Sequence, residues 1–201
     1  MKDKERKKDK ERATKDKEKI RWLIFSVIFG IAIAIIFLPG LFRSKKLFEK
    51  SPLIGHEPPD FKAEKIKENE NNEEIGKEKE TKSIKEIAAE SKIVFINFFA
   101  SWCTECKEER EKLMELKKNN KEIKIVGVVF QDSKDKISNY LKEKNPYDYI
   151  YFDSGETAID YGVSGVPETF LIIDGKIVKK FIGPISIYEA TKIMKEKTTL
   201  P

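Results

Sequence analysis

Apolar residues form one long run near the start of the chain and several short runs later in it. The long run, residues 22–42, contains no charged side chain. Roughly 20 apolar residues at a helical rise of 1.5 Å match the ~30 Å hydrocarbon core of a bilayer. A cleaved signal peptide has a shorter apolar core followed by a small-residue site, whereas Ala32-Ile33-Ala34 lies inside this run. We therefore expect a retained single-pass membrane helix at 22–42.

The short apolar runs alternate with helical segments, which is typical of an α/β domain. Strands are expected at 93–99, 123–130, 149–152, 168–173 and 177–182. Helices are expected at 83–89, 103–118, 132–144, 156–161 and 186–197. Capping boxes start the first and the last of these helices, and Asp132 and Ser154 are the expected caps of two others. Asp174-Gly175 predicts a hairpin between the last two strands. This order predicts a mixed sheet with helices on both faces.

Four segments with different compositions divide the chain. Residues 1–21 form a charged tail, 22–42 the membrane helix, 43–50 a linker and 51–199 one folded domain. A segment of about 150 residues is long enough to bury a substantial core. Inside this domain, the prolines of 51–61 predict an extended entry. Residues 67–82 are nearly all Lys, Glu and Asn, which predicts a mobile loop.

The distribution of charge predicts how the chain is oriented in the membrane but says little about its binding partners. The chain has 40 Lys and Arg against 35 Asp and Glu, and its net charge is only +5. The tail lacks aromatic residues and its acids nearly match its bases, so a solvated tail is favoured over nucleic-acid binding. Basic residues are denser before the apolar run than after it. By the positive-inside rule, the N-terminus lies in the cytoplasm and residues 43–201 lie outside it.

The two cysteines, Cys103 and Cys106, are the only ones in the chain and join a predicted strand to a predicted helix. A helix N-terminus offers a positive end field and unpaired N–H groups, which favour the reactive thiolate. The spacing also lets the second sulfur attack a disulfide formed by the first. A structural disulfide would usually close a longer loop. Zinc needs about four N or S ligands, and His56 is the only histidine. Dithiol–disulfide exchange is the favoured chemistry.

A second motif, 165–170 (Gly-Val-Pro-Glu-Thr-Phe), places a proline just before a buried strand. Together with Trp102-Cys103 and the strand order, it makes the chain resemble the thioredoxin superfamily. More narrowly, 51–61, 97–103 and 161–172 resemble the membrane-anchored cytochrome c maturation thioredoxins (CcmG/DsbE, TlpA-like). The resemblance covers about residues 51–197 and implies a thioredoxin-like α/β fold after one N-terminal transmembrane helix.

The resemblance also implies roles for individual residues. Cys103 and Cys106 form the redox-active disulfide, with Cys103 as attacking and Cys106 as resolving thiol. Trp102, Val166 and Pro167 contact substrate, with Pro167 in a cis peptide bond. No cofactor beyond the cysteine pair and no metal is implied.

The proton-transfer group is open, because Asn97 stands where thioredoxin has a buried Asp. Glu168 is the first candidate for that role, with Glu105 and Glu109 behind it. The alternative for Glu168 is a solvated charge at a strand end. Glu105 departs from the family, which often has Pro before the second cysteine, and its charge disfavours the Cys103 thiolate.

Three functions are compatible with these features. The first is reduction of the haem-attachment cysteines of apocytochrome c on the periplasmic side of the inner membrane, with a transmembrane thiol reductant as electron donor. The second is a general periplasmic thiol oxidase or isomerase. The third is a tethered module that docks apocytochrome without turnover. The resemblance favours the first.

Overall fold

The computed structural model describes residue 19 and residues 21–36, 51–65 and 80–198. The chain divides into two compact units, Met1–Phe48 and Glu49–Pro201. In the first unit, residues 21–36 are helical. Among the described residues, no helix is both long and apolar enough to cross a bilayer. The predicted span at 22–42 runs past residue 36, so its end, the linker at 43–50 and almost all of the tail lie outside the described residues.

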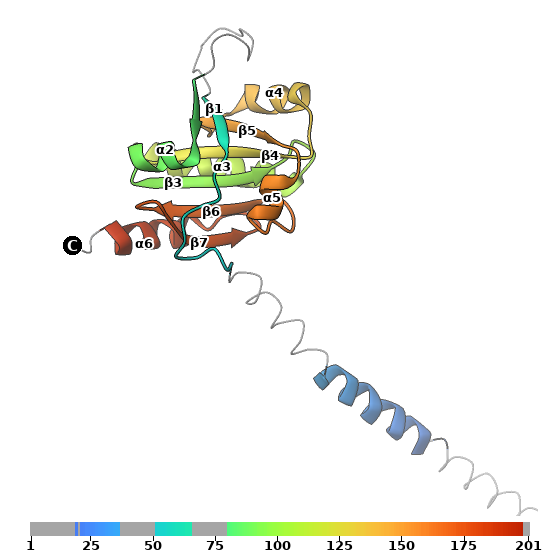
Figure 1. Ribbon diagram of the computed structural model, residues 1–201. Coiled ribbons are helices and arrows are strands. Elements are labelled where there is room, and N and C mark those ends of the chain that lie inside the picture. The colour runs from blue at the N-terminus through green and yellow to red at the C-terminus, as the bar shows by residue number, and fades with distance from the viewer. Residues whose placement is uncertain (1–18, 20, 37–50, 66–79, 199–201) are drawn as a thin grey trace, which may run out of the picture. The chain divides into compact units, whose positions relative to one another are not determined.

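The second unit is built on one mixed sheet of seven strands in the order β2-β1-β5-β4-β3-β6-β7 (Figure 1). The strands are β1 (Lys62–Lys65), β2 (Thr81–Ser83), β3 (Ile93–Phe99), β4 (Lys124–Phe130), β5 (Tyr149–Asp153), β6 (Glu168–Ile173) and β7 (Lys176–Ile182). The helices are α2 (Ile84–Glu90), α3 (Thr104–Asn119), α4 (Lys134–Glu143), α5 (Glu156–Asp160) and α6 (Ile187–Thr198). Strands β3, β4 and β5 are parallel, and the other pairs are antiparallel. The predicted mixed sheet is confirmed.

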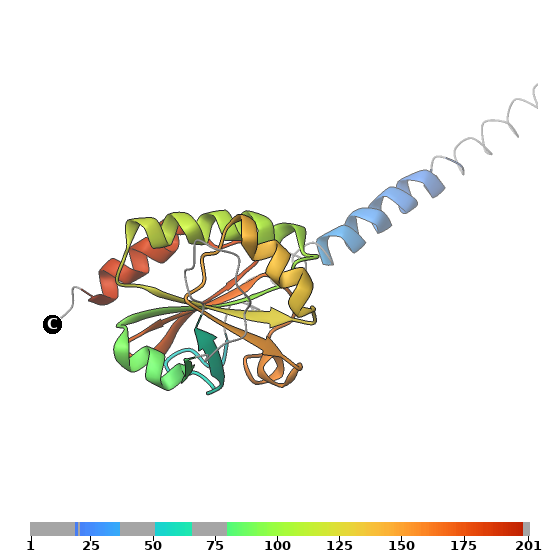
Figure 2. The ribbon, with the colours of Figure 1, turned by 90° about the horizontal axis from the view of Figure 1, so that it is seen from above.

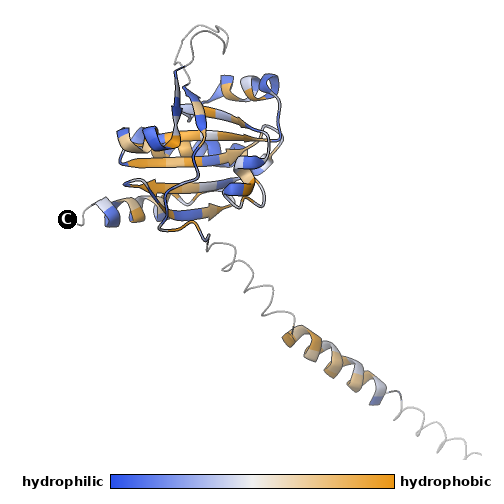
Figure 3. Cartoon of the chain, viewed as in Figure 1, coloured by the Kyte–Doolittle hydropathy of each residue, from blue (hydrophilic) through white to orange (hydrophobic). Residues whose placement is uncertain are grey.

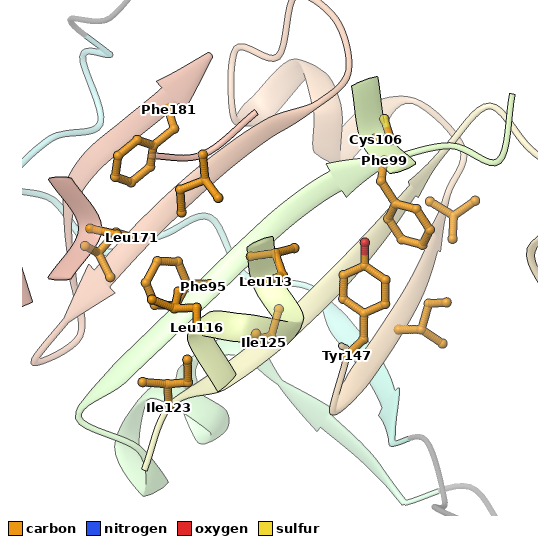
Figure 4. Packing of buried hydrophobic residues seen from close by; sticks show 14 of the residues in the cluster. Phe95, Phe99, Cys106, Leu113, Leu116, Ile123, Ile125, Tyr147, Leu171 and Phe181 are labelled. Carbon is orange, nitrogen blue, oxygen red and sulfur yellow. The ribbon is translucent and has the colours of Figure 1, made fainter. Parts of the chain in front are cut away.

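Helices cover both faces of this sheet, also as predicted. Figure 2 shows α3, α4 and α6 on one side and α2 and α5 on the other. All seven residues of β3 are buried, because alternate side chains enter two separate cores. Phe95 and Phe99 pack with Leu113 of α3, while Phe98 packs with Tyr161 on the opposite face. Figure 3 shows the hydrophobic residues along the central strands, and Figure 4 shows Cys106 among the side chains of the α3 face.

The structure corrects the sequence expectations at the edge of the sheet. Strands β1 and β2 were not predicted, and Thr81 and Lys82 pair with β1 instead of belonging to a loop. These strands are short and polar, with Ala63 the one buried residue of β1, so they lack the alternation that marks a half-buried strand. The rest of the predicted loop, up to residue 79, lies outside the described residues.

Helix starts are partly confirmed. The capping box of Ser83 and Glu86 is present. Ser133, not Asp132, is the N-cap residue of α4, and the Asp132 carboxylate is engaged elsewhere. Gly155 replaces Ser154 as the N-cap residue of α5, because the Asp153 carboxylate accepts the free N–H groups of that helix.

The predicted hairpin forms at Asp174-Gly175, with φ of 50° and 75°. Positive φ at both central residues is the type I′ geometry that fits the twist of the flanking strands. The turn aligns β7 with β6, so Glu168 lies opposite Ile182. The same register places Lys180 opposite Phe170, two residues after Glu168.

Candidate active site

The cysteine pair lies where β3 gives way to α3. Cys103 is the N-cap residue of α3, and its Sγ accepts a hydrogen bond of 3.1 Å from the Cys106 N–H. The two cysteines form a disulfide, with their Cα atoms 5.3 Å apart. Cys103 is 6% exposed and Cys106 only 2%. Cys103 thus lies at the helix N-terminus, a position that favours negative charge on a sulfur.

The turn before the cysteines is held by the loop after β4. The Asp132 carboxylate accepts hydrogen bonds from the Ser101 N–H (2.7 Å) and hydroxyl (2.6 Å). Partial burial opposes ionisation of Asp132, but these bonds and one from the Ser133 N–H outweigh it and lower its pKa. The Trp102 indole donates to the Gln131 carbonyl at 3.3 Å. Trp102 nevertheless stays 58% exposed beside Cys103.

The proline loop lies against the first cysteine. The Val166–Pro167 peptide bond is cis, in agreement with the resemblance. The Val166 carbonyl oxygen lies 3.5 Å from the Cys103 Sγ. Pro167 is buried, and β6 begins at the next residue, Glu168. The fold thus brings Trp102, Cys103, Val166 and Pro167 together from two distant segments.

A buried acid, Glu109, lies on the inward face of α3, three residues after Cys106. Its carboxylate accepts hydrogen bonds from the Asn97 amide (2.9 Å) and the Thr169 hydroxyl (2.7 Å). The Tyr147 hydroxyl donates to the Asn97 carbonyl at 2.7 Å, which extends the network. Burial raises the pKa of Glu109 to about 7, although these hydrogen bonds act in the opposite direction. An acid with such a pKa exchanges protons near neutral pH.

Glu168, the first sequence candidate for proton transfer, has a different environment. It is 1% exposed, so the alternative of a solvated strand-end charge is wrong. Its Oε2 lies 2.8 Å from the Lys180 ammonium. Its Oε1 accepts hydrogen bonds from the Ser164 N–H and hydroxyl. Glu105, the third candidate, is exposed in the first turn of α3.

From the sequence, Glu109 ranked behind Glu168 as the proton-transfer candidate, and neither the burial of Lys180 nor the Asn97–Tyr147 hydrogen bond was predicted. A signal for Glu109 does exist: it lies on the helix face spaced by three or four residues that also carries Cys106, Leu113 and Leu116. A lysine in the middle of an edge strand offers no comparable signal.

Comparisons with known proteins agree with this geometry. Residues 54–181 match the AhpC/TSA family. The chain is 38% identical over 121 residues to the thiol:disulfide interchange protein CycY of Rhizobium leguminosarum bv. viciae, covering 57% of this chain and 64% of that protein. It is 30% identical over 172 residues to the thiol:disulfide interchange protein DsbE of Vibrio cholerae, covering 80% of this chain and 86% of that one. The match to CycY thus spans slightly less than two thirds of that relative.

Solved structures share the fold. A putative thiol:disulfide interchange protein DsbE from Chlorobium tepidum superposes with a TM-score of 0.56 at 21% identity, covering 72% of this chain and 96% of that one. StoA from Bacillus subtilis superposes with a TM-score of 0.51 at 23% identity, covering 68% and 97%. These structures show a shared fold, and the family match together with the 30% identity to DsbE places the chain in the AhpC/TSA family, among the DsbE-type thiol:disulfide interchange proteins of thioredoxin-like fold.

Proposed function

We propose that this protein is a membrane-tethered dithiol–disulfide oxidoreductase that reduces the haem-attachment cysteines of apocytochrome c. The observation that carries the redox chemistry is the disulfide between Cys103 and Cys106 at the N-terminus of α3. The choice of client rests on the 51–61, 97–103 and 161–172 motifs and on the DsbE-type relatives. No cofactor other than the cysteine pair is required.

The reaction follows from the positions of the two sulfurs. In the reduced protein, the Cys103 thiolate attacks a client disulfide, forming a mixed disulfide and releasing one client thiolate. Cys106, one turn further into α3, then attacks the Cys103 sulfur. The second client sulfur leaves as a thiolate and the Cys103–Cys106 disulfide forms. Two electrons pass to the client, and a transmembrane thiol reductant restores the dithiol.

Proton transfer accompanies the second step, because Cys106 must lose its proton before it attacks. We assign this role to Glu109 ahead of Glu168, which the sequence had placed first. Glu109 is held by the neutral groups of Asn97 and Thr169, and its pKa of about 7 suits exchange near neutral pH. Glu168 is held by the Lys180 ammonium. Trp102, Val166 and Pro167 contact the client chain.

Tethering and location are part of the same proposal. The charge-free run at 22–42 and the helical conformation of 21–36 support a single-pass anchor in the lipid of the inner membrane. The basic tail at 1–21 supports a cytoplasmic N-terminus, with 43–50 as linker and the domain at 51–199 in the periplasm. Protease added to spheroplasts should digest the cysteine domain. Survival of the domain with loss of the tail would invert this topology.

The client is tested by trapping. Cys106→Ser removes the resolving sulfur, so clients should accumulate as mixed disulfides on Cys103. Mass spectrometry of the adducts should identify few proteins, dominated by apocytochromes with Cys-Xaa-Xaa-Cys-His sites. The Cys103→Ser variant lacks the sulfur that forms the mixed disulfide and serves as the negative control.

Two other results would favour the alternatives. Many unrelated secreted clients would indicate a general oxidase or isomerase. A Cys103→Ser strain that yields no adducts yet retains cytochrome maturation would indicate a docking module without turnover.

A further inference from the structure

The loop between α5 and β6 carries Val166 and is fastened by one buried ion pair. The side chains of Glu168 and Lys180 are 1% and 5% exposed, and their charged atoms lie 2.8 Å apart. Apart from this charge contact, the Glu168 Oε2 makes no hydrogen bond within the described residues. A buried ion pair of this kind brings little net stability, because desolvating both charges offsets their attraction. The role of this ion pair therefore lies in the position at which it holds the loop.

Each member of the pair holds a different point of the loop. The Lys180 ammonium donates to the Gly162 carbonyl at 2.7 Å. The Glu168 Oε1 accepts from the Ser164 N–H at 3.0 Å and from its hydroxyl at 2.6 Å. Lys180 also lies over the Phe170 ring, 5.3 Å from its centroid, which restricts the ammonium further. The start and the middle of the loop are thus tied to adjacent strands, β6 and β7.

The far end of the loop is anchored to the residue that follows β7. The Gly183 N–H, just after β7, donates to the Pro167 carbonyl at 2.9 Å. Between these anchors lies Val166, whose carbonyl is 3.5 Å from the Cys103 Sγ. A protein chain whose sulfur reaches Cys103 must pass along this backbone, whereas a small disulfide has no chain to align. Any shift of the loop therefore affects the two kinds of disulfide differently.

We propose that Lys180 and Glu168 act as positioning residues: their ion pair holds the 162–167 loop so that the Val166 backbone aligns extended polypeptide disulfides with Cys103. This inference rests on the proposed function, because it concerns how the reductase engages its protein clients. It assigns Glu168 a role through the loop and not through the sulfur. It also gives the buried Lys180 a function that the chemistry at the cysteines does not require.

The test compares two disulfides on the reduced full-length protein. One is a ten-residue peptide closed by a Cys-Xaa-Xaa-Cys disulfide, and the other is bis(2-hydroxyethyl) disulfide, which has no peptide backbone. Since small misplacements of a bound chain cost large factors in rate, Lys180→Met and the Glu168→Gln/Lys180→Met double variant should react about 10-fold more slowly with the peptide. The double variant, which leaves the net charge unchanged, should keep the wild-type rate with the small disulfide.

Three controls separate positioning from other effects. Lys180→Arg retains the charge and should recover most of the peptide rate. Lys179→Met removes the neighbouring lysine of β7, which pairs with Glu189 of α6 at 2.8 Å, and should leave both rates unchanged. The double variant removes one charge of each sign, so the thiolate titration midpoint of Cys103 should not move. It also avoids an unpaired buried charge, so it folds even if Lys180→Met does not.

The outcomes are distinguishable. Equal slowing with both disulfides in the double variant, or an unchanged peptide rate, would overturn the positioning role while leaving the reductase intact. A wild-type protein that reacts with neither disulfide faster than Cys103→Ser does would overturn the proposed function itself.

Discussion

Two buried glutamates, one in the helix that follows the cysteines and one directly after the Val166–Pro167 bond, lie in contrasting environments. Glu109 and Glu168 are each 1% exposed. Glu109 extends from α3 into a network of neutral donors, and burial raises its pKa to about 7. Glu168 begins β6 and faces the Lys180 ammonium. The difference shows that burial alone does not decide what a carboxylate does. A neutral setting leaves an acid that exchanges protons, whereas a buried cation leaves a charged group that holds structure.

The largest expected effect comes from breaking the ion pair. Lys180→Met leaves the Glu168 charge buried without its counter-charge, so the free energy of unfolding should fall by about 3–5 kcal/mol. Urea denaturation followed by circular dichroism measures it. The matched variant Lys179→Met disrupts a more exposed pair and should cost at most about 1 kcal/mol. Equal losses in the two variants would contradict the assignment of Lys180 as the buried member.

Glu109→Gln tests the role of the second glutamate through the pH dependence of the free energy of unfolding. The folded protein holds the Glu109 proton up to a pKa of about 7, against an ordinary 4.5. Between these pH values the folded state binds more protons than the unfolded state, so the free energy of unfolding falls as pH rises. The shift corresponds to about 3 kcal/mol, fully present below pH ~4.5 and lost above pH ~7.

The Gln variant has no proton to lose and should show no such fall, so it should be more stable than wild type above pH 7. Urea midpoints of the disulfide form at pH 4, 5, 6, 7 and 8 measure the difference. Parallel curves for the two proteins would show that Glu109 does not titrate in this range. In the reduced protein, the same substitution should flatten the pH dependence of the second step, release of the client from Cys103.

The smallest expected loss of stability comes from removing a single hydrogen bond to either glutamate. Thr169→Val removes a donor that lowers the pKa of Glu109, so that pKa should rise above about 7 and the pH window of the stability curve should extend upward. The lost bond should cost about 1 kcal/mol. Ser164→Ala, which removes a donor to Glu168, should cost a similar amount without moving the window. A shift of this pH range in Ser164→Ala would contradict the conclusion that the surroundings of Glu168 do not affect the titration of Glu109.

Much of the fold was predictable because its signals are local. The apolar runs of β3, β4 and β6, the Asp174-Gly175 turn and the Ser83 capping box each depend on neighbours in sequence, and each is confirmed. The cysteine site was predictable for the same reason, since a strand, two cysteines and a helix follow one another directly. Strands β1 and β2 were missed because polar edge strands are defined by their pairing partners.

The sequence by itself determined the cysteine pair at a strand-to-helix junction, the five strands β3 to β7 and the hairpin turn, because their patterns are local and periodic. Only the tertiary structure decided what the two glutamates do. The partners of Glu109 come from β3 and β6, 12 and 60 residues away in sequence. Lys180 and Lys179 are identical neighbours in β7, and the register against β6 buries one while the other pairs with α6. The charge state and role of a buried carboxylate depend on such distant partners, which local sequence patterns do not encode.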